Sequence, residues 1–145
     1  MRDFIFPGKE KKDRLAEQAA AYILSLNDET IRTLTAADVA AKVNMNLIFL
    51  SFIFKIAQKI SIANFILREK LHRAFFILDK NRDISILELA KILGFAEAEI
   101  FEAEFEKYYA IKPILFQELR EKNRDFDKTG YKLPGDVFEQ LRDIV

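Results

Sequence analysis

The chain has 145 residues, 50% of them apolar and 32% charged, a balance typical of one globular domain with a substantial core. Its 23 basic residues match its 23 acidic residues, so it lacks the basic excess that a dedicated nucleic-acid-binding domain usually carries. The absence of cysteine excludes disulfides and thiolate metal sites. The one histidine, His72, leaves little for metal or acid–base chemistry, so we expect it on the surface and expect no metal.

Neither a signal peptide nor a membrane-spanning segment is visible in the sequence. The N-terminus holds charged residues and Pro7-Gly8, and the most apolar stretch, residues 47–54, is far shorter than the roughly 20 residues that cross a bilayer. No nucleophile, carboxylate pair or glycine-rich phosphate loop stands out. We therefore expect a cytoplasmic protein that is not an enzyme, has no cofactor and does not bind a membrane.

Apolar residues recur with helical period along the chain, and Gly and Pro stand near the boundaries of the periodic stretches. No stretch alternates as a half-buried strand does, so the predicted fold class is all-α. The first predicted helix opens with a charged run from Lys9 to Arg14, which indicates a solvated helix end or, alternatively, a phosphate-contacting arm. Helices are predicted over residues 9–27, 36–43, 47–57, 62–80, 86–93, 97–109, 114–122 and 135–143.

Residues 35–43 and 85–93 are two copies of one pattern, offset by 50 residues. Each copy opens with a hydroxyl residue and has an acid three positions later, which is the capping-box pattern of a helix start. A residue that can adopt positive φ, Asn44 or Gly94, ends each copy, and a second amphipathic helix follows at an offset of 51. The capping residues are Thr35 and Asp38 in the first copy and Ser85 and Glu88 in the second.

The pattern of a helix, a tight turn and a second helix occurs twice. It predicts two helix-turn-helix units that are joined by a long linker helix, with extra helices at both ends. We expect these elements to form a single domain over residues 1–145. Its parts are an N-terminal helix (1–34), the first unit (35–59), the linker helix (60–82), the second unit (83–120) and a C-terminal extension (121–145).

Three segments in register resemble one known family. Leu50, Phe54 and Lys55 are similar to its Leu-x-x-x-Phe-Lys, residues 65–78 resemble its linker helix, and residues 84–95 resemble its second unit. The family is that of AraC/XylS-type transcription regulators, and the resemblance covers only their DNA-binding domain, in divergent form. It implies a transcription regulator that binds double-stranded DNA through two helix-turn-helix units.

The second helix of a helix-turn-helix unit is its recognition helix, called the reading helix here, and it enters the major groove. Polar residues on the reading helix of the first unit and on the linker helix are the candidate DNA contacts. Bases and phosphates offer mainly hydrogen-bond partners and negative charge, which amide, hydroxyl and cationic side chains complement. The candidates are Asn46, Ser51, Lys55, Arg68, Lys70 and Arg73.

Other positions on the second helix of each unit, or directly after it, depart from the family. Phe52 stands where the family commonly has an arginine, Lys59 and Ala110 stand where it has glycines, and residues 97–107 hold five glutamates against one lysine. The glutamates indicate either a helix face exposed to solvent or an acidic surface for protein interaction. Direct contact with bases is the third interpretation, and it is the one that the glutamates favour least. The run 47–54 is either buried beneath the N-terminal helix or a protein interface. The candidate protein contacts are Leu47, Ile48, Phe49, Phe52, Glu97, Glu99, Glu102 and Glu106.

The sequence therefore leaves two functions open. The first is an AraC-type regulator that binds DNA. The second is a degenerate AraC-like domain that has lost DNA binding and serves as a protein-interaction or regulatory module, with a protein partner or as a homodimer.

Overall fold

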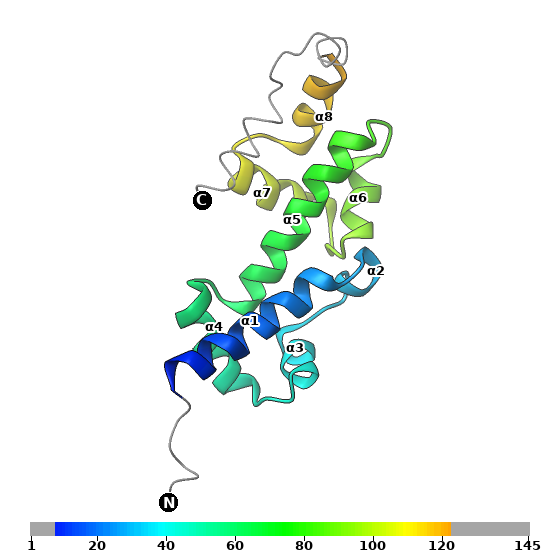
Figure 1. Ribbon diagram of the computed structural model, residues 1–145. Coiled ribbons are helices and arrows are strands. Elements are labelled where there is room, and N and C mark those ends of the chain that lie inside the picture. The colour runs from blue at the N-terminus through cyan, green and yellow to red at the C-terminus, as the bar shows by residue number, and fades with distance from the viewer. Residues whose placement is uncertain (1–7, 123–145) are drawn as a thin grey trace, which may run out of the picture. The chain divides into compact units, whose positions relative to one another are not determined.

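Figure 1 shows the computed structural model of the chain, which describes residues 8–122. These residues form eight helices and no strand, which confirms the all-α prediction. The predicted helix over 135–143 lies outside the described residues. The helices are α1 (Lys9–Ser25), α2 (Asp28–Ile31), α3 (Ala36–Lys42), α4 (Leu47–Gln58), α5 (Ile62–Lys80), α6 (Ile86–Ile92), α7 (Ala98–Tyr109) and α8 (Pro113–Lys122).

The short helix α2 was not predicted, because α1 was expected to run on to residue 27. Instead, Leu26 is extended and ends α1. Asn27 then caps α2, its side-chain Oδ1 accepting a hydrogen bond of 2.8 Å from the backbone N–H of Thr30. Asparagine followed by two acids in the first turn is a helix start, since both features complement the unpaired N–H groups there.

Contacts divide the chain within α5 into two compact units, residues 1–70 and 71–145. The predicted linker helix is therefore one continuous helix whose first half belongs to unit 1 and whose second half belongs to unit 2. The single domain expected over 1–145 stays a prediction.

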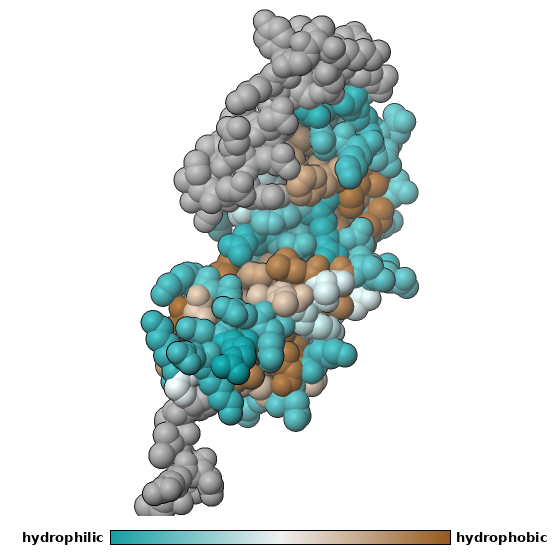
Figure 2. All heavy atoms as spheres, viewed as in Figure 1, coloured by the Kyte–Doolittle hydropathy of each residue, from teal (hydrophilic) through white to brown (hydrophobic). Residues whose placement is uncertain are grey.

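The core of unit 1 forms where α1 packs on α3 and α4. α1 presents small residues such as Ala16 and Ala19, both fully buried, and these allow α4 to approach closely. From α4, Leu50 and Phe54 fill the core, and the Phe54 ring meets that of Phe65 edge to face at 5.4 Å. Figure 2 shows the side of α1 that faces away from this core. That side is hydrophilic over the first turns of α1 and more hydrophobic toward its C-terminal end.

The core of unit 2 contains a cluster of aromatic rings. Phe75 of α5 packs against Phe116 of α8 and Tyr109 of α7, with ring centroids 4.8 and 5.1 Å apart. Two polar side chains of α8 are buried with partners. Gln117 donates to the Ile84 carbonyl at 2.7 Å. Arg120 forms an ion pair of 2.5 Å with Asp79.

His72 was expected on the surface, but it is half-buried. Its Nε2 lies 3.0 Å from the hydroxyl of Tyr108, a residue that α7 brings up from 36 positions further along the chain. Sequence periodicity within α5 could not foresee this partner, because it depends on how α7 folds back.

Within residues 8–122, no single helix is long and apolar enough to cross a membrane. The helices α3 and α4 reach that length and apolar character only as a pair, and the pair is bent by 98°.

Candidate nucleic-acid interface

The first helix-turn-helix unit consists of α3, a tight turn and α4. Thr35 and Asp38 form the complete capping box: the Thr35 N–H donates to Asp38 Oδ2 at 2.9 Å, and the Asp38 N–H donates to Thr35 Oγ1 at 3.1 Å. Asn44 takes a φ of 56° in the turn. The Met45 N–H then donates to the Ala40 carbonyl at 2.9 Å, which closes a Schellman motif.

The second unit, α6 and α7, repeats this turn bond for bond. Gly94 has a φ of 84°, and the Phe95 N–H donates to the Ala90 carbonyl at 2.9 Å. Ser85 Oγ accepts from the Glu88 N–H at 3.0 Å, which is the serine half of the predicted box. α7 begins 51 residues after α4, so the predicted one-residue insertion lies between Phe95 of the turn and the start of α7 at Ala98. The repeat is therefore structural, and each residue of α4 has an equivalent on α7.

The apolar run of α4 has a buried side and an exposed side. The expected burial therefore holds for part of the helix, and the expected protein interface stays a prediction. Leu50, Ile53 and Phe54 are buried in the core of unit 1. Three residues on the opposite side form what we call the α4 stripe, and they recur every fourth position. The stripe consists of Ile48, Phe52 and Ile56, whose exposed fractions are 80%, 60% and 56%. Leu47 is 38% exposed and Phe49 is half-buried, so both lie at its margin.

Ile56 was not among the predicted contact residues. The signal was present in the sequence, since Ile56 follows Phe52 by the same four positions that separate Phe52 from Ile48. It was missed because the most apolar stretch ends at Phe54, two positions earlier.

The polar candidates on α4 differ in what they can offer to a ligand. Asn46 caps the helix, and its Oδ1 accepts from the N–H groups of Ile48 and Phe49 at 2.9 and 3.2 Å. Ser51 is half-buried, whereas Lys55 is exposed. Lys59, exposed as well, follows α4 in the left-handed region. Lys55 and Lys59 are thus the cations that α4 and its C-cap present to solvent.

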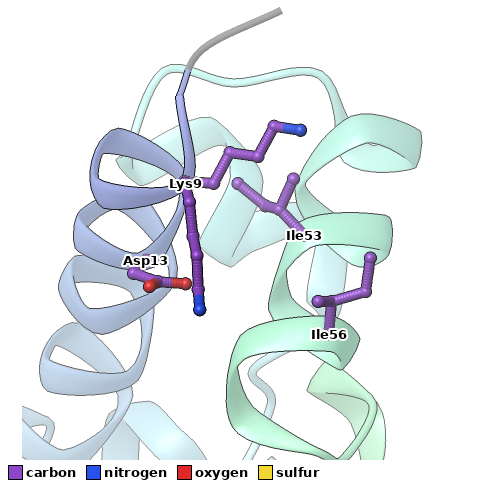
Figure 3. A pocket seen from close by; sticks show the side chains of 5 residues that line it. Lys9, Asp13, Ile53 and Ile56 are labelled. Carbon is purple, nitrogen blue, oxygen red and sulfur yellow. The ribbon is translucent and has the colours of Figure 1, made fainter.

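Two adjoining hollows lie between the first turns of α1 and the second half of α4. The first has a volume of about 220 Å³ and is lined by Lys9, Lys12, Asp13, Ile53 and Ile56. Figure 3 shows Lys9 and Asp13 on α1, with Ile53 and Ile56 on the facing wall from α4. The second, of about 410 Å³, shares Lys9, Asp13 and Ile56 and adds Glu17, Ala57, Gln58 and Lys59. The charged start of α1 therefore lies beside one end of the α4 stripe.

The reading face of α7 is acidic. Glu97, Glu99 and Glu106 are exposed, whereas Glu102 is half-buried. Glu97 stands at the N-cap without a capping side-chain hydrogen bond. The equivalents of Ile48 and Phe52 are Glu99 and Ala103, so the two units present different chemistry from the same scaffold positions.

The basic candidates on α5 are half-buried and already in contact with protein atoms. The Arg68 guanidinium lies 5.1 Å from the centre of the Phe65 ring. Lys70 donates to the Arg32 carbonyl at 3.3 Å, and burial lowers the pKa of its ammonium group. Arg73 belongs to unit 2, so Arg68 and Arg73 come from different units.

The zero net charge of the whole chain conceals a difference between the units. Within the described residues, unit 1 has 10 Lys and Arg against 7 Asp and Glu, a net charge of +3. Unit 2 has 8 against 10, a net charge of −2. Phosphates would therefore be attracted to unit 1 and repelled by unit 2.

Comparisons with known proteins agree with the resemblance that the sequence shows. No family model matches the chain. The "Msm operon regulatory protein" of Streptococcus mutans is 29% identical over 85 residues, which are 59% of this chain and only 30% of that protein.

Two solved structures have the same fold. One is an AraC-type transcriptional regulator from Chromobacterium violaceum, with a TM-score of 0.65 and 20% identity over 74% of this chain and 92% of that one. The other is the C-terminal domain of AraT, a response regulator from Geobacillus stearothermophilus, with a TM-score of 0.63 and 22% identity over 72% of this chain and 84% of that one. The chain therefore has the fold of an AraC-type DNA-binding domain, in a divergent sequence.

Proposed function

We propose that the protein is an AraC-type transcription regulator that binds double-stranded DNA, and that unit 1 supplies the contact. The fold and the similarity to an operon regulatory protein support the regulatory role. The observation that carries the choice of unit is the charge difference, +3 for unit 1 against −2 for unit 2. Phosphate contacts supply most of the affinity that does not depend on sequence, so the basic unit is the one that can approach a duplex.

Within unit 1, the reading helix α4 is flanked by cations that can face phosphates. Lys55 and Lys59 are exposed, and Lys9 of α1 lies beside Ile56. Asp13 and Glu17 line the same hollow and offset part of this charge. The binding is therefore expected to be weak at physiological salt and to strengthen as the salt concentration falls.

Duplex binding measured against salt concentration tests this proposal. Fluorescence anisotropy with a labelled duplex should give an affinity that falls steeply as salt rises. Lys55→Gln with Lys59→Gln should weaken binding and reduce the slope of log K against log salt by about 2, since each lysine that faces a phosphate adds about one to that slope. The matched control is Lys91→Gln with Lys107→Gln in unit 2, which should leave both quantities unchanged. No binding at low salt would overturn the proposal.

A second candidate is the protein-interaction module that has lost DNA binding. The observation that favours it is the exposure of Ile48 and Phe52, at 80% and 60%, because contiguous apolar surface often marks a protein partner. Sedimentation equilibrium separates the candidates. Self-association that Ile48→Ser and Phe52→Ser abolish would support this second function, whereas a monomer that binds duplex DNA would support the first.

A further inference from the structure

We propose that the α4 stripe reads thymine in the major groove through the C5-methyl group of the base. The inference rests on the proposed function, since it names what unit 1 would recognise in a duplex. It concerns Ile48 and Phe52 first, because they are the most exposed residues of the stripe.

The chemistry of these side chains limits what they can bind. The edges of guanine, cytosine and adenine in the major groove carry hydrogen-bond donors and acceptors, which isoleucine and phenylalanine cannot satisfy. Thymine alone among the four bases adds an apolar group there, its C5-methyl. Ile48 and Phe52 are exposed on the helix that follows the tight turn, where a helix-turn-helix protein places its reading residues. Contact with methyl groups would remove their apolar surface from water.

Helix geometry then sets the spacing of the contacts. Four residues rise about 6 Å along an α-helix, whereas successive bases on one strand are about 3.4 Å apart. Ile48 and Phe52 are therefore too far apart along α4 to share one base pair. The stripe fits a short site that presents thymine methyls at two different base pairs.

Charge favours DNA over a second copy of this chain as the occupant of the stripe. Lys59 and Lys9 line the hollow that includes Ile56, beside the acids Asp13 and Glu17, and Lys55 lies on the exposed side of α4. Phosphates on either side of a major groove complement such cations. A second copy of unit 1 would instead bring another unit of net charge +3 against the first, which opposes association.

The equivalent positions on α7 provide an internal contrast. Glu99 and Ala103 replace Ile48 and Phe52, and the exposed Glu106 replaces Lys55. The glutamates repel phosphates, and the alanine offers far less apolar surface than phenylalanine. Sensitivity to thymine methyls should therefore depend on α4 and not on α7.

Replacement of thymidine by deoxyuridine tests the inference, because it removes the methyl group and keeps the hydrogen-bonding groups of the base. The full chain is first used to select the tightest duplexes from a random-sequence pool at low salt. The selected duplex is then made with thymidine or with deoxyuridine. Each methyl group that the stripe touches should strengthen binding about fourfold, so the deoxyuridine duplex should bind more than about tenfold more weakly when two are absent.

Variants of the chain assign the effect to the stripe. Ile48→Ser with Phe52→Ser should bind both duplexes equally, which also controls for any change that deoxyuridine makes to DNA shape. The matched control is Leu24→Ser, which alters a residue of α1 that is 53% exposed. It should keep the full preference for thymidine. Circular dichroism of each variant confirms that the helices are intact.

The outcomes separate this inference from the proposed function. A thymidine preference that the stripe variant loses supports the inference. Equal binding of both duplexes by the unaltered chain overturns it and leaves DNA binding standing. No binding to either duplex overturns both. Self-association that depends on Ile48 and Phe52 assigns the stripe to a protein partner and likewise overturns the inference.

Discussion

Ala110 ends α7 with a φ of 61° and a ψ of 22°, in the left-handed region where the AraC resemblance expects a glycine. Replacing it with glycine should stabilise unit 2. A residue with a Cβ atom in this region costs about 1–2 kcal/mol, because the Cβ lies too close to the next carbonyl oxygen. Glycine removes that cost. It also lowers the free energy of unfolding by roughly 0.5–1 kcal/mol, because it gives the unfolded chain more conformational freedom. The net gain expected for Ala110→Gly is about 0.5–1 kcal/mol.

The assay is reversible thermal and urea unfolding of the full chain followed by circular dichroism. For a chain of this size, the gain corresponds to a rise of roughly 2–4 °C in Tm. The matched control is Ala103→Gly, an exposed position inside α7, where glycine should cost about 1 kcal/mol. If Ala110→Gly lowered stability as much as Ala103→Gly, the left-handed conformation would not be the source of strain, and the reasoning would be refuted.

Three further predictions concern contacts within single units. Thr35→Ala should cost about 1 kcal/mol by removing a helix cap, whereas Thr33→Ala, at an exposed site, should cost less than about 0.5 kcal/mol in the same urea titration. Asp79→Ala should cost about 2–3 kcal/mol, because it leaves the guanidinium of Arg120 buried without its carboxylate; a destabilisation under about 1 kcal/mol would contradict this account. Burial lowers the folded-state pKa of Lys70 below 10.5, so the unfolded chain binds this proton more tightly. Stability should therefore rise with pH through the folded pKa and up to 10.5, and a Lys70→Met variant that showed the same rise would disprove the assignment.

Much of the scaffold could be predicted because its signals are local. Thr35 and Asp38 are three positions apart, and the bonds of a capping box join only those residues. Asn44 and Gly94 were expected to adopt positive φ, and both do. The repeat at offsets of 50 and 51 predicted two equivalent helix-turn-helix units before any packing was known.

The candidate site could be predicted only in part, because exposure depends on distant segments. Helical periodicity alone left open whether the run 47–54 was buried or exposed. It is both, since Leu50 and Phe54 are buried in the core that other helices complete, whereas Ile48 and Phe52 are exposed. Lys70 was expected among the DNA contacts, yet it donates to a carbonyl 38 positions away in the sequence.

The sequence by itself determined every described helix except α2, the caps at Thr35 and Ser85, and the two turns, because these depend on residues within a few positions of one another. Tertiary structure alone decided how charge and apolar surface are distributed. Within the described residues 8–122, the division within α5 separates a unit of net charge +3 from a unit of net charge −2. The packing of α1 on α4 leaves an apolar stripe beside lysines. Long-range packing chooses which side of a helix meets water, and no local pattern along the chain contains that choice.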